Sequence, residues 1–463
     1  MKKIRDLIKC DFDIDILGVT DDSRNVKNGY LFVATKGFNE DHFDYIDDAI
    51  NKGCSFIICD RKIDKKFPHL VVDKINDVFF DICLKFYNIN LNDYKFMGVT
   101  GTDGKTTTAT IVSKIIDNCA YIGTNGFVVN NINYGTNNTT PCISELYEDL
   151  KIIKEKNCSN VMMEVSSEAL LHDRVKNIKY DIVGFTNITG DHLNVHKSFD
   201  NYIECKLKLL NYLKDDGICI VNGDDEILRK VKCKNVYTYG FNEDNDFIIF
   251  DDKYDKDFTS FSVKYKDEIY MIKSPLKCKY NVYNVCLGFV MGLFYGVDSS
   301  TLISNIKKLE PINGRCEFLD FGQPFDIVLD YAHTINGIKT IIESFKDYKD
   351  IIVVTGCAGG REKDKRPIIG SYIIENVDKA IFTMDDPRYE SVDEIINDMV
   401  VDKKDYFRII DRREAIHFAL SIANVESIVL ILGKGRDNYM AIEDKKIKYN
   451  DYEVIKKYFK NRT

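Results

Sequence analysis

The 463-residue sequence has no long uninterrupted apolar run and no net positive charge. No segment approaches the roughly 18 consecutive apolar residues of a membrane-spanning helix, so we expect no membrane insertion. The formal charge of −9 argues against a nucleic-acid partner, because phosphate backbones select net basic surfaces. A local cationic pocket for a small anionic substrate remains compatible with this charge.

Paired metal-binding motifs and secretion signals are also lacking. The 14 cysteines are scattered without any CxxC pair, and the basic start Met1–Arg5 is not followed by an apolar segment. We therefore expect a cytoplasmic protein with reduced, mostly buried thiols and no zinc site. The content of 44% hydrophobic and 30% charged residues is typical of a globular protein, and the length favours two or three domains.

Three successive runs of strand and helix patterns divide the chain into residues 1–93, 94–311 and 312–463. Residues 44–52 and 106–119 have helical patterns, whereas residues 245–275 alternate and predict antiparallel strands. The pattern as a whole predicts an α/β protein with largely parallel sheets and helices on both faces. Apolar runs typical of strands lie at 30–34, 55–59, 70–72, 95–100, 161–165, 182–185, 218–221, 327–329, 351–354, 380–383 and 428–432.

The strongest single motif is Gly101-Thr102-Asp103-Gly104-Lys105-Thr106-Thr107, between a strand pattern and a helix pattern. Glycines let backbone N–H groups wrap around phosphate oxygens, and the following helix adds its positive end. Lys105 would neutralise the β- and γ-phosphates of a nucleotide, and the Thr106 hydroxyl would bind Mg²⁺. Val99 replaces the first glycine of a strict Walker A motif, so this is the shorter Gly-Thr-x-Gly-Lys-Thr form. The alternative is a turn that binds no phosphate.

Further candidate metal ligands follow this loop. Glu164 lies at the end of an apolar strand pattern, where a carboxylate can hold a metal, although it could also be a solvated strand-end residue. His192 and His196 lie four residues apart beside Asp191, but no HExxH pattern or cysteine accompanies them. We therefore favour one histidine that assists Mg²⁺ over a zinc site, and surface histidines remain the alternative.

The order of these and later motifs resembles the Mur ligases of bacterial cell-wall synthesis. The N-terminal Asp22–Val26 and Gly29–Ala34 resemble the uridine-nucleotide domain of the MurE type, and the resemblance runs from about residue 18 to about residue 455. The motifs are Gly101–Thr107, Asn138–Pro141, Met163–Ser167, Asp191–Leu193, Tyr202–Lys206, Asn313–Arg315, Asp330–Thr334 and Gly433–Gly435.

The resemblance implies a UDP-substrate domain at 1–93, a central P-loop ATPase domain at 94–311 and a Rossmann-like amino-acid domain at 312–463. It implies an ADP-forming ligase that adds a diamino acid to UDP-N-acetylmuramoyl-L-alanyl-D-glutamate in peptidoglycan precursor synthesis. The D-glutamate carboxylate would attack the γ-phosphate of ATP, and an amine would displace phosphate from the acyl phosphate. Closure of the third domain would exclude water. We expect a monomer.

The resemblance also assigns functions to individual residues. Lys206 would carry a CO₂-derived carbamate that helps to hold a second Mg²⁺, although without the resemblance it would be a solvated helix lysine. The catalytic residues would be Lys105, Glu164, His192 and Lys206, and the metal ligands Thr106, Glu164, His192 and carbamylated Lys206. ATP would contact Gly101, Thr102, Asp103, Gly104, Lys105, Thr106, Thr107, Asn281, Asn284, Arg315 and Asp330. The UDP-substrate would contact Ser23, Asn138, Thr139, Thr140, Ser166, His172 and Arg174.

Another group of residues would bind the incoming amino acid. Arg388 matches the arginine with which diaminopimelate-adding members pair the distal carboxylate, and a guanidinium suits that contact. We therefore favour meso-2,6-diaminopimelate. Asp386 replaces a usual asparagine and Asp437 a usual glutamate, so L-lysine, ornithine or another diamine stays open; Glu168 and Gly190 are further departures. The full set is Arg361, Asp385, Asp386, Pro387, Arg388, Gly433 and Asp437.

Two other functions are weighed against this one. A related amide ligase, such as a folylpolyglutamate synthetase, would begin with its ATPase domain, which the segment Asp22–Arg24 argues against. A non-enzymatic paralogue that only binds nucleotide is disfavoured because one set of residues is retained together: Lys105, Thr106, Glu164, His192 and Lys206.

Overall fold

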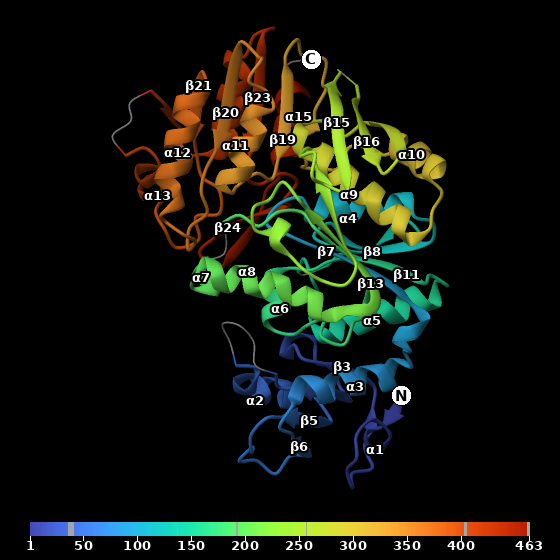
Figure 1. Ribbon diagram of the computed structural model, residues 1–463. Coiled ribbons are helices and arrows are strands. Elements are labelled where there is room, and N and C mark those ends of the chain that lie inside the picture. Colours follow the sequence, from blue (N-terminus) through green and yellow to red (C-terminus); the bar gives the residue numbers. More distant parts are fainter. Residues whose placement is uncertain (36–40, 137, 191–192, 256, 402–404, 461–463) are drawn as a thin grey trace.

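Three main β-sheets follow one another along the chain, each with helices packed against it (Figure 1). The computed structural model describes residues 1–35, 41–136, 138–190, 193–255, 257–401 and 405–460. The N-terminal sheet has four strands, the central sheet eleven and the C-terminal sheet six. Every helix in these ranges is too short or too polar to span a bilayer. The predicted α/β fold class is confirmed.

The N-terminal sheet is parallel throughout and consists of β3 (Gly18–Thr20), β4 (Tyr30–Val33), β5 (Phe56–Cys59) and β6 (His69–Val71), in that order. Successive side chains point to opposite faces, so Phe32 packs beside helix α2 (Ile46–Asn51) and Leu31 packs toward helix α3 (Ile75–Tyr87). Short elements complete this part: β1 (Lys2–Lys3), α1 (Ile4–Leu7), β2 (Asp15–Ile16), η1 (Ser23–Asn25), η2 (His42–Tyr45) and η3 (Leu91–Asp93).

The central sheet is mainly parallel, with antiparallel strands at both ends. The antiparallel strands predicted within residues 245–275 are confirmed. The spatial order is β10 (Ile132–Asn133), β9 (Gly126–Val129), β8 (Cys119–Gly123), β11 (Asn160–Glu164), β7 (Lys95–Thr100), β12 (Tyr180–Phe185), β13 (Leu213–Asn222), β14 (Val236–Gly240), β15 (Phe247–Tyr254), β16 (Thr259–Tyr265) and β17 (Glu268–Ser274).

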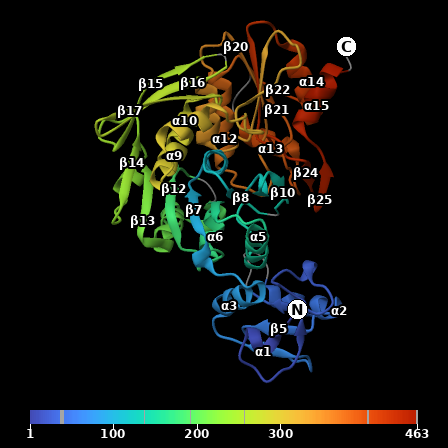
Figure 2. The ribbon, with the colours of Figure 1, turned by 90° about the vertical axis from the view of Figure 1, so that its right-hand side faces the viewer.

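Helices cover both faces of the central sheet. One face packs on α4 (Lys105–Ile115), α9 (Lys279–Tyr295) and α10 (Ser299–Lys307). The other packs on α5 (Ile143–Glu155), α6 (Ser167–Leu171) and α8 (Phe199–Leu207), and α5 contacts α3 of the N-terminal part (Figure 2). Smaller elements here are α7 (Leu193–His196), η4 (Lys208–Tyr212) and η5 (Leu228–Lys230).

The helix predicted at 106–119 is wrong at its C-terminal end. Helix α4 ends at Ile115, because Ile116 is extended and Asn118 takes a left-handed conformation with a φ of 51°. Asparagine tolerates that conformation better than most residues. The chain then enters β8 at Cys119, a strand that the sequence patterns did not predict.

The C-terminal sheet is parallel except for its first strand, and two layers of helices cover it. Its order is β18 (Glu317–Phe318), β19 (Asp326–Asp330), β23 (Ser427–Leu432), β20 (Asp350–Thr355), β21 (Lys379–Phe382) and β22 (Phe407–Arg408). One layer comprises α11 (Ile335–Glu343), α12 (Lys365–Asn376) and α13 (Val392–Met399), and the other α14 (Arg412–Ile422) and α15 (Asp451–Lys460). A hairpin of β24 (Tyr439–Ile442) and β25 (Lys445–Lys448) precedes α15.

A buried ion pair joins the second helix layer to this sheet. The Arg412 guanidinium donates from Nε and Nη2 to the two carboxylate oxygens of Asp451, at 2.9 and 2.8 Å, and both side chains are fully buried. Arg412 also donates to the carbonyl of Leu432 at the end of β23. The pair therefore ties α14, α15 and β23 together.

We expect Asp451→Asn to lower the free energy of unfolding by about 3 kcal/mol, because the buried Arg412 charge would lose its partner. Urea unfolding measures this loss. Asp393→Asn is the control, because it breaks an ion pair with Arg408 whose side chains are 61% and 30% exposed. That variant should lose less than about 1 kcal/mol. Equal losses would contradict the structural importance of the buried pair.

Candidate active site

The glycine-rich loop lies between the end of β7 and the start of α4, as predicted. Gly104 has a φ of 82°, and a Cβ there would lie 2.4 Å from the Asn284 side-chain oxygen. A Cβ on Gly101 would lie 1.8 Å from the Thr186 hydroxyl. Both positions therefore require glycine, and the loop is packed tightly against its neighbours.

Two lysine ammonium groups converge on this loop. Lys105 Nζ donates to the carbonyls of Gly101 and Thr102, each at 2.8 Å. Lys206, on α8, donates to the same Gly101 carbonyl at 2.7 Å, and it is 1% exposed. Its ammonium lies 4.7 Å from the centre of the Tyr202 ring. The structure thus brings two of the predicted catalytic residues together and concentrates positive charge where phosphates would bind.

The Glu164 carboxylate, at the end of β11, is fully buried beside the loop. It accepts hydrogen bonds from the Thr106 hydroxyl at 2.9 Å and the Tyr121 phenol at 2.5 Å. The backbone N–H of Thr124 donates at 2.8 Å and the Thr124 hydroxyl at 3.2 Å. Burial raises the pKa of Tyr121 well above its usual value, so the phenol stays a donor. Oxygen ligands from Thr106 and Glu164 suit Mg²⁺.

Sequence patterns alone missed Tyr121 and Thr124 as parts of the site. Both depend on β8, which pairs in parallel with β11 and places Tyr121 opposite Met162. Only a prediction of strand β8 from the sequence could have indicated that the C-terminal end of β8 lies beside Glu164. Thr124 also connects the carboxylate to the substrate side, because its hydroxyl lies 3.0 Å from that of Thr139.

Some of the predicted substrate residues gather on the other side of Glu164. The Thr140 hydroxyl donates to the Glu164 carbonyl at 2.8 Å and accepts from the Ser166 N–H at 2.9 Å. Arg174 donates to the Thr140 carbonyl at 3.3 Å. Asn138 lies close to Thr140 in the sequence and is exposed. His172 follows α6 and is half-buried, and this burial lowers its pKa. Ser23 lies in η1 of the N-terminal part, where its carbonyl accepts from Lys52.

The predicted histidine pair has two different outcomes. His192, with Asp191, lies outside the described residues. His196 is buried edge-to-face against Tyr202, with ring centres 5.2 Å apart, and burial lowers its pKa. The described part of the chain contains no group of three His, Cys, Asp or Glu side chains placed to hold a metal.

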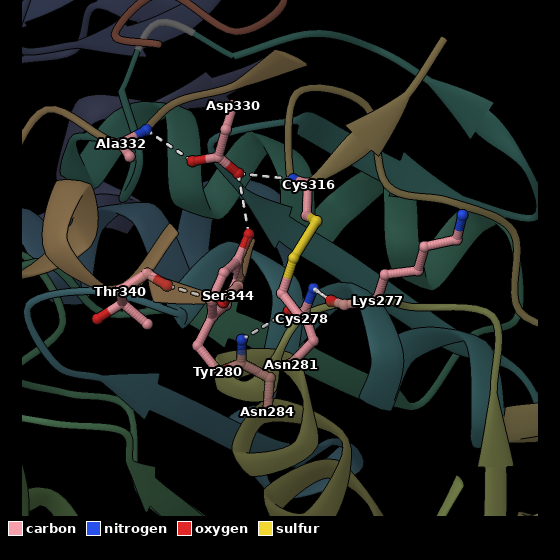
Figure 3. Close-up of a disulfide and its surroundings, with 10 residues drawn as sticks. All are labelled: Lys277, Cys278, Tyr280, Asn281, Asn284, Cys316, Asp330, Ala332, Thr340 and Ser344. Carbon is pink, nitrogen blue, oxygen red and sulfur yellow. Dashed lines mark hydrogen bonds between the residues drawn. A yellow bond between two sulfur atoms is a disulfide. The ribbon is translucent and has the colours of Figure 1, made fainter. Parts of the chain in front are cut away.

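A cleft of about 1140 Å³ lies between the central and C-terminal parts. Asn281 and Asn284 lie at the start of α9, and Asn284 donates to Asn281 at 3.0 Å (Figure 3). Asp330, opposite them, accepts from Tyr280 at 3.1 Å. Burial raises the pKa of Asp330. The residues lining the cleft include Asp103, Gly104, Thr107, Asn284, Arg315 and Asp330, which were all predicted to contact ATP.

The C-terminal part contacts the phosphate loop directly. Arg315 Nη2 donates to the Thr106 hydroxyl at 3.2 Å, and the guanidinium lies 4.7 Å from the Tyr331 ring centre. The Thr334 hydroxyl donates to Asp103 at 3.3 Å. The loop, the metal-binding candidates and the third sheet therefore form one site.

Three of the predicted amino-acid-binding residues surround the buried Lys434, which is 1% exposed. Its ammonium lies 2.8 Å from Asp386, 3.5 Å from Asp437 and 3.9 Å from Asp385. Asp437 also accepts from the Tyr331 phenol at 2.8 Å. Burial raises the pKa of Asp385. Sequence patterns did not identify Lys434 as the cation that compensates these carboxylates.

Arg388 lies beside this cluster in a strained backbone conformation. Its φ is 49°, and Nη1 donates to the Gly359 carbonyl at 2.5 Å. Pro387 and Gly359 are in close contact, because a Cβ on Gly359 would lie 2.0 Å from the Pro387 carbonyl oxygen. Gly433 (φ 106°) approaches Asp385, and Arg361 is partly exposed on the neighbouring loop.

Two cysteines beside the cleft are joined by a disulfide, which differs from the expectation of reduced thiols (Figure 3). Cys278 precedes α9, and Cys316 follows Arg315. The backbone N–H of Cys316 donates to Asp330 at 2.6 Å. The remaining cysteines are free.

Comparisons with known proteins agree with this arrangement. Residues 99–292 match the Mur ligase middle domain, and residues 314–435 match the Mur ligase glutamate ligase domain. A UDP-N-acetylmuramoyl-L-alanyl-D-glutamate–2,6-diaminopimelate ligase from Bacillus cereus is 33% identical over 98% of both chains. A ligase of the same name from Fusobacterium nucleatum is 33% identical over 95% of this chain and 93% of its own.

Solved structures share the fold. A structure of a UDP-N-acetylmuramoyl-L-alanyl-D-glutamate–2,6-diaminopimelate ligase superposes with a TM-score of 0.67, at 24% identity over 100% of this chain and 99% of its own. A MurF ligase from Thermotoga maritima in complex with ADP gives a TM-score of 0.68, at 20% identity over 96% of this chain and 98% of its own. The chain belongs to the Mur ligase family of ATP-dependent ligases.

We expect Tyr121→Phe to raise the Mg²⁺ concentration needed for half-maximal ADP release, because Glu164 would lose the phenol that orients it. The reaction is titrated with Mg²⁺ at saturating ATP. Tyr147→Phe is the matched control, because Tyr147 is fully buried and its hydroxyl has no hydrogen-bond partner among the described residues. An unchanged Mg²⁺ requirement in Tyr121→Phe, or an equal shift in the control, would contradict this assignment.

Proposed function

We propose that the protein joins a diamino acid, meso-2,6-diaminopimelate, to UDP-N-acetylmuramoyl-L-alanyl-D-glutamate in peptidoglycan precursor synthesis, with ATP converted to ADP and phosphate. The observation that carries the proposal is the buried Glu164 carboxylate, which lies between the phosphate loop and the substrate threonines. The near full-length similarity to ligases named for this reaction supports it.

The ATP half of the site is formed by the loop, Lys105 and the residues of the cleft. Backbone N–H groups of the loop and the Lys105 ammonium would neutralise the phosphates. Asn284 and Asp330 line the cleft in which the nucleoside would bind, and Asn281 is hydrogen-bonded to Asn284. Thr106 and Glu164 would hold Mg²⁺, with His192 as a further ligand, and the ion would supply charge neutralisation at the transferred phosphoryl group. We include carbamylation of Lys206, which would turn this buried cation into an anion that can bind a second Mg²⁺.

The acceptor carboxylate enters from the Thr139 side. Thr139, Ser166 and Arg174 supply hydroxyl and guanidinium donors that can hold an anionic peptide. Thr140, whose hydroxyl donates to the Glu164 carbonyl, would help to position them. The substrate's D-glutamate carboxylate attacks the γ-phosphate and forms an acyl phosphate, which the amine then converts to an amide. Asn138, His172 and, at the uridine end, Ser23 complete the proposed contacts.

The choice of diaminopimelate depends on Arg388. Asp386 carries a negative charge that the usual asparagine lacks, and Lys434, at 2.8 Å, compensates this charge. Asp437 contacts both Lys434 and Tyr331. Arg388 can therefore keep its remaining N–H groups for the distal carboxylate of the ligand. In this proposal Asp437 would contact the distal amine and Arg361 the other carboxylate. The homologous ligases are named for 2,6-diaminopimelate, which favours the same amino acid here.

Several broader assignments belong to this proposal. The boundaries 1–93, 94–311 and 312–463 would separate the UDP-substrate, ATPase and amino-acid domains, and each range contains one main sheet. We also propose that the enzyme works as a monomer in the cytoplasm, where its nucleotide substrates are made.

A product assay tests the proposal. The protein is supplied with ATP, Mg²⁺, UDP-N-acetylmuramoyl-L-alanyl-D-glutamate and either meso-diaminopimelate or L-lysine, and the products are weighed by mass spectrometry. We expect the diaminopimelate adduct together with ADP and phosphate. A product with lysine alone would overturn the amino-acid assignment, and AMP with pyrophosphate would overturn the mechanism.

Arg388→Ala should lower kcat/KM for diaminopimelate by about a hundredfold, as expected for the loss of a charged hydrogen-bonding partner worth roughly 3 kcal/mol. The KM for ATP should stay nearly unchanged, because Arg388 lies outside the phosphate loop. Arg408→Ala is the matched control, since Arg408 belongs to the same part of the chain and pairs with Asp393. Equal losses for ATP and diaminopimelate would show that Arg388 does not contact the amino acid.

A further inference from the structure

Two cysteines meet across the joint between the central and C-terminal parts. Cys278 immediately precedes α9, which packs on the central sheet, whereas Cys316 immediately precedes β18 of the C-terminal sheet. The two residues are 38 positions apart in sequence, and their sulfur atoms are bonded (Figure 3). The bond therefore bypasses the connecting segment after α10 and links the two parts directly.

Both cysteines have backbone conformations that L-residues rarely adopt. The φ angle is 76° at Cys278 and 47° at Cys316. Strained positions of this kind are concentrated at functional and switching sites. Both residues are largely buried, at 4% and 5% exposure, and Cys278 lines the cleft.

The immediate neighbours of this pair belong to the nucleotide site. Arg315, adjacent to Cys316, contacts the Thr106 hydroxyl, and the Cys316 N–H contacts Asp330. Cys278 lines the nucleotide cleft and lies three residues before Asn281. A change in the position of either cysteine is thus transmitted to groups on both walls of the cleft.

We propose that Cys278 and Cys316 form a redox-active dithiol site, whose reversible disulfide locks the C-terminal part against the central part and slows turnover. The Cα atoms are 7.0 Å apart, at the upper end of the distances that a disulfide spans. The bond therefore permits only a narrow range of separations at this joint. Ligases that close for chemistry and open for product release need movement there.

The co-reactant is a low-molecular-weight disulfide, R–S–S–R. Cys278 attacks first, because it lies in the cleft lining and the N-terminal end of the 17-residue helix α9 stabilises its thiolate. Its sulfur bonds to one R–S group, and the other leaves as R–S⁻. Cys316 then displaces the second R–S⁻ and forms the protein disulfide. The two protein thiols lose two electrons, R–S–S–R is reduced to two R–SH, and the two thiol protons end on these products.

The test compares the full-length protein in thiol-reduced form with the same protein treated with oxidised glutathione. Peptide mapping without reduction should find a Cys278–Cys316 linked peptide in the treated sample. The kcat for ADP release should fall by about tenfold, within the range typical of coupled sites, and dithiothreitol should restore it. The mass of the linked peptide alone reports formation of the disulfide, so this part of the test does not depend on the proposed substrates.

Cysteine variants separate this pair from other thiols. Cys316→Ser and Cys278→Ser should form no linked peptide, and each should keep the kcat of its own reduced form after treatment. Cys233→Ser is the matched control, because Cys233 forms another close thiol pair, with Cys219; this variant should respond like the unmodified protein. If a variant fails to fold, the peptide map of the unmodified protein still shows whether Cys278 and Cys316 become linked. The absence of the linked peptide, or an unchanged kcat despite its formation, would overturn the proposal.

Discussion

The buried carboxylate of Glu164 is the interaction on which the rest of the site depends. A carboxylate without solvent contact is stable only when its oxygens are hydrogen-bonded, and here the donors come from α4 and from the end of β8. These contacts fix the start of the phosphate-loop helix, the end of β11 and the Thr124 turn relative to one another. As a result, the ATP side and the substrate side meet at one residue, and Thr124 is the link between them.

The C-terminal part completes the site through charge compensation. Lys434 is buried among three aspartates, and Arg412 is buried with Asp451, so charged side chains are buried beside the sheet without being left unpaired. Arg315 then reaches across the cleft to Thr106. Because these contacts cross between separately folded sheets, the site exists only when the two parts are close together. This geometry explains why a cross-link at the joint could control the reaction.

Local sequence patterns identified much of the fold and the loop, but not the contacts between distant segments. The strand leading to Gly101 and the loop itself were predictable because spacing and apolar runs are local properties. Lys206 of α8 was indicated only by the family resemblance, since local patterns alone favoured a solvated lysine. Strand β8 was missed because its short run follows a helical pattern without a strong break, and Tyr121 and Thr124 were missed with it. The compensation of Asp386 by Lys434 and the meeting of Cys278 with Cys316 arise from tertiary packing, so no local pattern indicates them. The expectation of reduced thiols was therefore wrong for Cys278 and Cys316, whereas the other twelve cysteines are free.

In the proposed reaction the D-glutamate carboxylate receives the terminal phosphoryl group of ATP. Isotope transfer tests it most directly: UDP-N-acetylmuramoyl-L-alanyl-D-glutamate is prepared with ¹⁸O in the carboxylates of its D-glutamate residue and turned over with unlabelled ATP and the diamino acid. The account predicts one ¹⁸O atom in each inorganic phosphate released with ADP. Phosphate without label, or label recovered in AMP, would contradict it.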